Sequence, residues 1–110
     1  MIARLLTFVV ALALAGPALA HRLNVFASIE GEEVVVETGF STGRIPVAGE
    51  VRVEDAQGEL VATYELAEDG TLRFPLDRAA VEAGGLSITV TVGEHEGYWL
   101  LTPADLDLGS

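Results

Sequence analysis

The amino-acid sequence predicts an all-β protein, a small seven-stranded β-sandwich of the immunoglobulin-like or transthyretin-like kind. Apolar and polar residues alternate with a period of two along most of the chain after residue 21, as they do in strands with one buried face. Turn-forming residues recur roughly every 8 to 12 residues, a spacing typical of sandwiches. Because the chain has no cysteine, the disulfide of antibody domains is excluded.

The expected strands follow one another with short turns between them. Residues 22–30 and 33–40 are joined by Gly31-Glu32, which indicates a β-hairpin. A loop is expected at 41–49, and residues 77–85 are the one helix-like segment, closed by Gly84-Gly85. The remaining strands are expected at 47–55, 59–66, 71–76, 86–94 and 95–103. The residues expected to face inward on the strands include Leu23, Val25, Ala27, Ile29, Val34, Val36, Thr38, Phe40, Val47, Val51, Val53, Leu60, Ala62, Tyr64 and Leu66.

The first twenty residues have the layout of a secretory signal peptide. Arg4 precedes an apolar run from Leu5 to Ala15, and Ala18-Leu19-Ala20 matches a small-residue cleavage site. The apolar run is shorter than the roughly 20 residues that a membrane span needs. We therefore expect a signal peptide at 1–20, a β-sandwich domain at 21–104 and a flexible tail at 105–110, in a periplasmic or secreted protein with no membrane span of its own.

Composition narrows the classes of function. Loss of Arg4 with the signal leaves five arginines against seventeen acidic residues, a formal charge of −12, and there is no lysine. Such a charge disfavours nucleic acid and anionic lipid as partners and favours cations, including metal ions. There is no cysteine nucleophile, no Gly-rich phosphate loop and no G-x-S-x-G motif, and we expect no enzymatic activity.

The two histidines are the candidates for chemistry. Cleavage after Ala20 would make His21 the first residue, so that its free amine and ring nitrogen could chelate one metal ion. His95 lies at the junction of the last two expected strands, and a first strand near the last would let it approach His21. Glu94 and Glu96 flank it as possible oxygen ligands. Three nitrogens of this kind suit Cu(II) or Ni(II), while Zn(II) and Co(II) are also compatible.

The mature chain resembles the small periplasmic domains that accompany energy-coupling-factor type nickel and cobalt transporters, which have a carboxypeptidase-regulatory-like β-sandwich. The similarity covers an opening His21-Arg22-Leu23-Asn24-Val25-Phe26-Ala27, a strand pair from Gly49 to Gly58, a turn from Asp69-Gly70 to Phe74, and the late His95. The bend Gly93-Glu94-His95-Glu96-Gly97 is more acidic than the Gly-Gly-His-Arg type of the family. The resemblance implies Ni(II) or Co(II) as the bound metal, His21 and His95 as ligands, and a membrane transporter component as partner.

Several alternatives stay open at the level of sequence. The same nitrogens would serve a periplasmic copper-binding or copper-buffering protein, since affinity at such sites favours Cu(II) over Ni(II). A metal-free interaction module would use exposed strand edges or loops, with His21 incidental. An oxidative copper enzyme built on a histidine brace is the remaining interpretation, although the chain is short for the substrate-binding face that such an enzyme needs.

Overall fold

The computed structural model describes residues 22–108, so the expected signal peptide and His21 lie outside the described residues. The elements in chain order are β1 (Leu23–Glu30), β2 (Glu33–Phe40), β3 (Glu50–Asp55), β4 (Leu60–Glu65), β5 (Thr71–Pro75), α2 (Arg78–Glu82), β6 (Leu86–Val92), β7 (His95–Leu101) and α3 (Ala104–Leu108). The predicted class, an all-β sandwich of seven strands, is confirmed.

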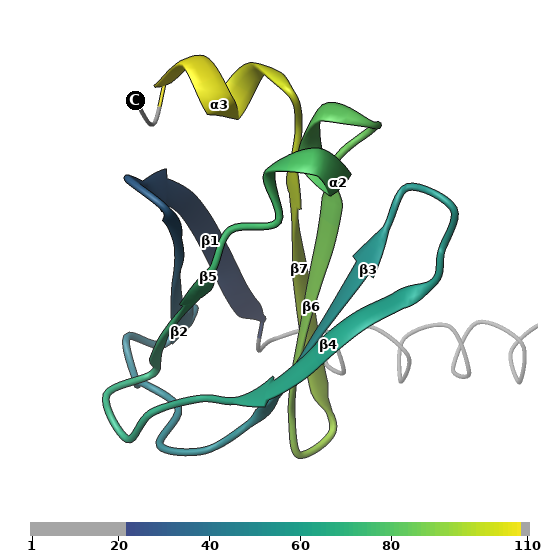
Figure 1. Cartoon of the computed structure of the whole chain (residues 1–110). Coiled ribbons are helices and arrows are strands. Elements are labelled where there is room, and N and C mark those ends of the chain that lie inside the picture. Colours follow the sequence, from purple (N-terminus) through teal and green to yellow (C-terminus); the bar gives the residue numbers. More distant parts are fainter. Residues whose placement is uncertain (1–21, 109–110) are drawn as a thin grey trace, which may run out of the picture.

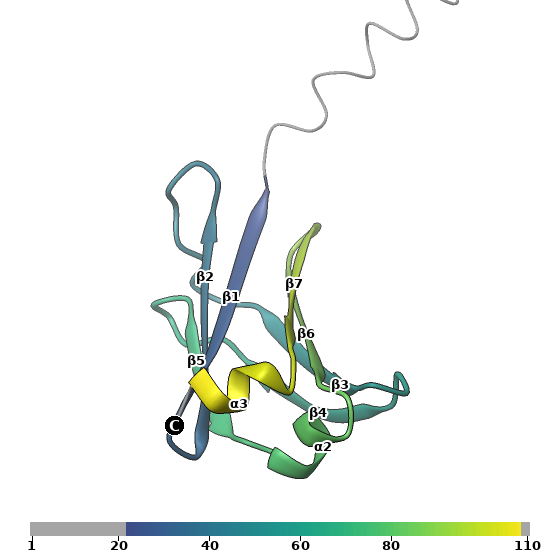
Figure 2. The same cartoon turned by 90° about the horizontal axis from the view of Figure 1, so that it is seen from above.

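The strands form two antiparallel sheets that face each other (Figures 1 and 2). One sheet has the order β1-β2-β5, and the other has the order β4-β3-β6-β7. The β1–β2 hairpin pairs every residue from Leu23 with Phe40 to Glu30 with Glu33, as expected from its short glycine turn. Gly31 in that turn has φ +61°, a conformation that glycine adopts at little cost.

The core forms where the inward faces of the two sheets meet. Burial alternates along β1 and β6, because successive side chains of a strand point to opposite faces. The fully buried side chains come from both sheets and from α2, and they are Val34, Val36, Val51, Val53, Val81, Ile88, Val90 and Leu101. This apolar interior holds the sandwich together without disulfides.

Strands β1 and β7 are edge strands of different sheets that lie side by side (Figures 1 and 2). A Cβ on Gly97 would lie 2.5 Å from the carbonyl oxygen of Leu23, so only glycine allows this approach. Further along, the rings of Phe26 and Trp99 meet edge to face with centroids 4.9 Å apart. Because both contacts advance in the same direction, the two strands run parallel.

Two expected inward-facing residues were assigned wrongly. Val47 is 70% exposed and lies in the loop before β3, which begins only at Glu50. The Leu66 N–H donates to the Gly49 carbonyl at 2.9 Å, so the chain joins this layer at Gly49, whereas Val47 lines a pocket described below. Leu60 is exposed at the start of β4, an edge strand whose register with β3 shifts between Val53 and Glu54.

The polar tail also differs from expectation, because Ala104–Leu108 forms α3. The backbone N–H of Thr102 donates to Asp105 at 2.7 Å, and the N–H of Asp105 donates to the carbonyl of Thr102 at 3.0 Å. This reciprocal arrangement resembles a capping box. Leu106 then packs against the core, which gives the short helix a tertiary contact that periodicity in so few residues does not reveal.

Candidate metal site and adjoining pocket

His95 is the first residue of β7 and lies at the same end of the sandwich as the loop after β2. Its half-buried side chain shares the inner face of β7 with Gly97, Trp99 and Leu101. The imidazole meets the ring of Phe40 edge to face, with centroids 5.2 Å apart and an interplanar angle of 74°. This aromatic contact holds the His95 imidazole beside Phe40, the last residue of β2.

The two flanking glutamates do not converge on His95. Glu94 is exposed in the turn between β6 and β7, and Glu96 is exposed on the outer face of β7. Alternation along the strand sends the side chains of His95 and Glu96 to opposite faces. Between Arg22 and Leu108, no group of three or more His, Cys, Asp or Glu side chains is arranged to hold a metal ion.

The other predicted ligand, His21, lies outside the described residues, but its neighbour in sequence is well anchored. The N–H of Arg22 donates to Ser41 Oγ at 3.1 Å, and the N–H of Ser41 donates to the Arg22 carbonyl at 2.8 Å. Ser41 follows Phe40, which contacts His95. The start of the described chain is thereby tied to the same end of the sandwich as His95.

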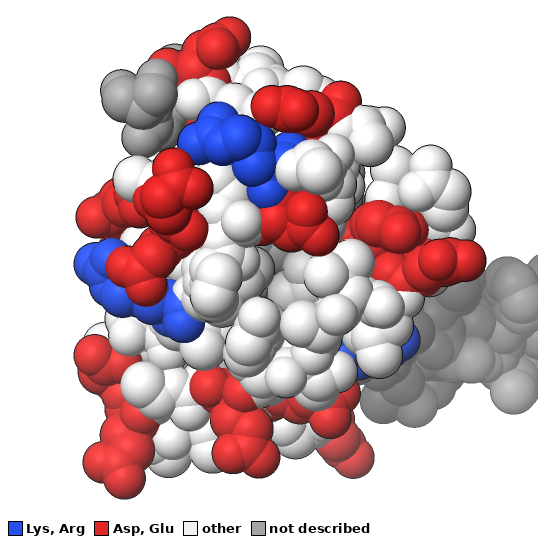
Figure 3. Space-filling model, in the orientation of Figure 1, with Lys and Arg blue, Asp and Glu red and all other residues white. Residues whose placement is uncertain are grey.

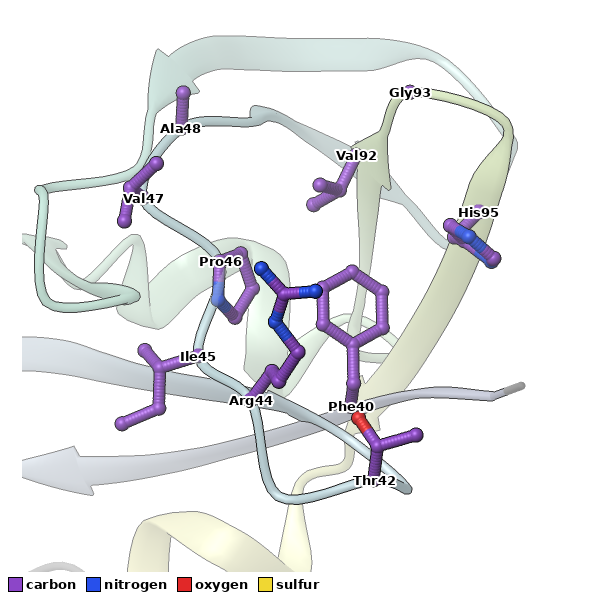
Figure 4. Close-up of a pocket in the computed structure, with 10 residues that line it drawn as sticks. All are labelled: Phe40, Thr42, Arg44, Ile45, Pro46, Val47, Ala48, Val92, Gly93 and His95. Carbon is purple, nitrogen blue, oxygen red and sulfur yellow. The ribbon is translucent and has the colours of Figure 1, made fainter.

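A pocket of about 590 Å³ adjoins His95. One wall comes from the end of β2 and the loop after it, and the other from the β6–β7 hairpin (Figure 4). Its lining residues are Phe40, Thr42, Arg44, Ile45, Pro46, Val47, Ala48, Val92, Gly93 and His95. The guanidinium group of Arg44 points into the middle of this ring of residues (Figure 4).

Backbone contacts hold the loop that forms the first wall. The N–H of Phe40 donates to the Arg44 carbonyl at 2.8 Å, and the N–H of Gly43 donates to the Phe40 carbonyl at 2.9 Å. From the β4–β5 turn, Gly70 packs so closely on Ile45 that a Cβ there would lie 2.6 Å from its Cγ2. The hydroxyl of Thr38 donates to the Gly70 carbonyl at 2.7 Å. The pocket wall is therefore supported from two sides.

The charge around the pocket differs from that of the rest of the surface. Acidic side chains cover much of the face seen in Figure 3, yet the residues that line the pocket include no Asp or Glu. Three described arginines form ion pairs elsewhere, since Arg52, Arg73 and Arg78 each lie within 4 Å of a glutamate. Arg44 forms no ion pair with any described residue.

The pocket was not predicted from the sequence, which indicated only a loop at 41–49. A signal was nevertheless present, because Ile45 and Val47 are apolar residues in a segment otherwise rich in turn formers. Loops usually carry polar side chains at the surface, and exposed apolar ones can mark a binding surface. Such residues in a loop, beside a single arginine, identify a candidate site without fixing its shape.

Comparisons with known proteins add little to this description. No protein-family model and no curated protein matches the chain. A crystal structure of Ruminococcus gnavus β-glucuronidase matches with 24% sequence identity and a TM-score of 0.37, covering 74% of this chain and 15% of that enzyme's chain. The match spans only a small share of that enzyme's chain, and so weak a likeness carries no argument. No helix within residues 22–108 has the length and hydropathy needed to cross a membrane.

Proposed function

We propose that this protein is a periplasmic accessory protein of a nickel or cobalt uptake transporter, which binds the metal ion through His21 and His95. The ligands are the free amine and ring nitrogen of His21, exposed by signal cleavage, and the imidazole of His95. The ion is a cargo that passes on by ligand exchange, and no catalysis is involved. The sequence resemblance to transporter-associated domains supports the choice of metal and partner.

The observation that carries the proposal is the parallel course of β1 and β7. Leu23 touches Gly97, and His21 and His95 each precede these residues by two positions. An extended chain advances about 3.3 Å per residue. If the path of β1 continued for two residues beyond Leu23, His21 would lie beside His95. The anchoring of Arg22 on Ser41 supports such a continuation.

The donor set would consist mainly of nitrogen atoms. Glu96 lies on the opposite face of β7, and Glu94 lies in the exposed turn, so neither is required as a ligand in this proposal. Nitrogen donors with few carboxylates suit Ni(II), Co(II) or Cu(II) better than Mg(II) or Ca(II). Acid should weaken binding, because the amine and both imidazoles bind metal only when deprotonated.

The decisive experiment is a titration of Ni(II), Co(II) and Cu(II) into a chain that starts at His21 and into one with a single alanine added before it. The added residue converts the amine of His21 into an amide and keeps both imidazoles. We expect the Ni(II) affinity to fall about 100-fold, equivalent to roughly 2.8 kcal/mol. Unchanged affinity would contradict a role for the new N-terminus.

Matched variants of the hairpin test the second ligand. His95→Phe keeps an aromatic ring against Phe40 but removes the nitrogen donor, so Ni(II) affinity should fall while the fold persists. Glu96→Gln should leave the affinity unchanged, because that side chain points away from His95. If His95→Phe and wild type bind the metal equally well, the proposed pairing of the two histidines is wrong.

A metal-free interaction module remains the second candidate, favoured by exposed apolar side chains. Phe26, Tyr98 and Leu100 are all about half exposed or more along β1 and β7, and such side chains in contiguous patches often mark protein contacts. This candidate predicts that replacing both histidines leaves partner binding intact. The metal-binding proposal predicts that the same replacement abolishes any partner binding that needs the bound metal ion.

A further inference from the structure

The pocket beside His95 combines apolar walls with one cationic group. Phe40, Ile45, Val47 and Val92 supply the apolar surface, and Ile45 and Val47 remain 57% and 70% exposed. Folding has left this apolar surface uncovered although the domain contains a well-packed core elsewhere. The guanidinium of Arg44 points into the space that they enclose (Figure 4).

Arg44 is a cation without a counter-ion in a strongly acidic protein. Arg44, like Arg22, forms no ion pair within residues 22–108, whereas Arg52, Arg73 and Arg78 each pair with a glutamate. The chain has seventeen acidic residues, and none of those within residues 22–108 lines the pocket. Their absence from the pocket lining leaves the guanidinium available for an external anion.

We propose that this pocket binds a small organic carboxylate with an apolar body. The carboxylate accepts hydrogen bonds from the Arg44 guanidinium, whose fork geometry matches the two carboxylate oxygens. The apolar body lies against Phe40, Ile45 and Val92. The volume of about 590 Å³ falls within the range of small-molecule sites. This site shares His95 with the proposed metal site, but the carboxylate is held by Arg44 and needs no metal ion.

The charge of the protein argues for a monoanion rather than a phosphate or polyanion. The surface is strongly negative, with a formal charge of −11 for the full sequence, so a multiply charged ligand would be repelled on approach. A single arginine neutralises one charge, and Thr42 and His95 are the other lining residues with polar side chains, so most of the wall offers a phosphate no hydrogen bond. A carboxylate that carries an aliphatic or aromatic group matches both the guanidinium of Arg44 and the apolar wall of the pocket.

The test uses the chain that starts at His21, without metal, and follows its backbone amide signals by NMR during titration with 3-phenylpropionate and with 3-phenylpropanol. The two probes share the apolar body and differ in the carboxylate. We expect saturable shifts confined to residues 40–48 and 92–95, with the carboxylate binding at least about 10-fold more tightly than the alcohol. Equal affinity of the two probes, or no saturable shift, would overturn the proposal.

Two arginine variants with the same change of charge provide the control. Arg44→Gln should lose about 10-fold in affinity for 3-phenylpropionate, while Arg78→Gln, whose ion pair with Glu32 lies away from the pocket, should bind as wild type does. If both variants lose affinity equally, net charge rather than the pocket explains the binding, and the assignment of Arg44 is wrong. Because no metal is present, the result is independent of the fate of the metal-binding proposal.

Discussion

The two ends of the sandwich differ in how they are closed. At the end seen at the top of Figure 1, α2 buries Val81 completely and α3 packs Leu106 against the core. At the other end, the loop at 41–49 leaves Ile45 and Val47 exposed around a pocket. The closed end also carries the ion pairs of Arg73 and Arg78 with glutamates of the β1–β2 turn and its flanks.

The residues that stabilise the domain therefore lie mainly at the end covered by α2 and α3, the closed end. The residues available for binding lie at the end with the pocket, the open end. Buried apolar surface at the closed end contributes to the free energy of folding, whereas exposed apolar surface at the open end contributes little until something covers it. Both proposed ligands, a metal ion at His95 and a carboxylate beside Arg44, belong to the open end. Substitutions at the two ends should therefore have opposite consequences for stability and for binding.

The largest contrast is expected between two glycines with positive φ. A Cβ at Gly85, φ +108°, would overlap the backbone carbonyl of Leu101 at the closed end. Gly93, φ +59°, has open space around its Cβ position at the open end. Gly85→Ala should lower the free energy of unfolding by about 3 kcal/mol or more, and Gly93→Ala by about 1 kcal/mol from backbone strain alone.

Chemical denaturation of both variants measures this contrast through the shift of the unfolding midpoint at constant slope. Wild type is the common reference, and the substitution is the same in both variants. Equal losses of stability would mean that close packing of Gly85 on Leu101 adds nothing to the strain of the positive φ. The closed end would then be less tightly packed than described.

A smaller contrast is expected between two valines. Val81 of α2 is 0% exposed, and Val47 is 70% exposed. Val81→Ala removes two buried methyl groups and leaves a cavity, so it should cost about 2 kcal/mol of stability, whereas Val47→Ala should change it by less than about 0.5 kcal/mol. Thermal unfolding of the two variants checks this, and a large loss in Val47→Ala would show that the pocket wall is structural rather than available for ligands.

Alternation in the sequence was enough to predict the sandwich, because burial in β1 and β6 follows the period of two that the residues display. The short helix could also be predicted from the sequence. The Asp77 side chain accepts a hydrogen bond from the N–H of Ala80 at 3.1 Å, and Gly84 follows the C-cap Ala83 with φ +153°. These features depend on neighbours in sequence, which is why local patterns reveal them.

The parts that sequence patterns missed depend on tertiary contacts. Val47 continues the alternation of β3 but lies in the loop before it, where its side chain lines the pocket. The pocket exists because the loop after β2 and the β6–β7 hairpin meet in space. The condition for the two histidines to meet, a first strand near the last, is fulfilled by β1 and β7. The pairing of His21 with His95 stays a prediction, since residue 21 lies outside the described part.

The smallest predicted effect concerns the β4–β5 turn that supports the open end. The hydroxyl of Thr71 donates to Asp69 Oδ1 at 2.6 Å, and this bond, with a second from the Thr71 N–H at 3.1 Å, lowers the pKa of the Asp69 carboxyl below its usual value of 3.8. Thr71→Val removes the hydroxyl and keeps the N–H. The pKa of Asp69 should therefore rise towards 3.8, as followed by carboxyl ¹³C shifts during an acid titration.

The sign of the pH dependence follows from the lowered pKa of Asp69. The carboxylate contributes to stability above its unfolded pKa, and that contribution disappears as the pH falls through the folded value. The stability difference between wild type and Thr71→Val should hence be constant at neutral pH and shrink in acid, below about pH 4. Thr63→Val, on exposed β4, should leave the Asp69 titration unchanged. A shift of equal size in that control would mean that the open end responds to any loss of a hydroxyl, and that its turn is not specifically braced by Asp69.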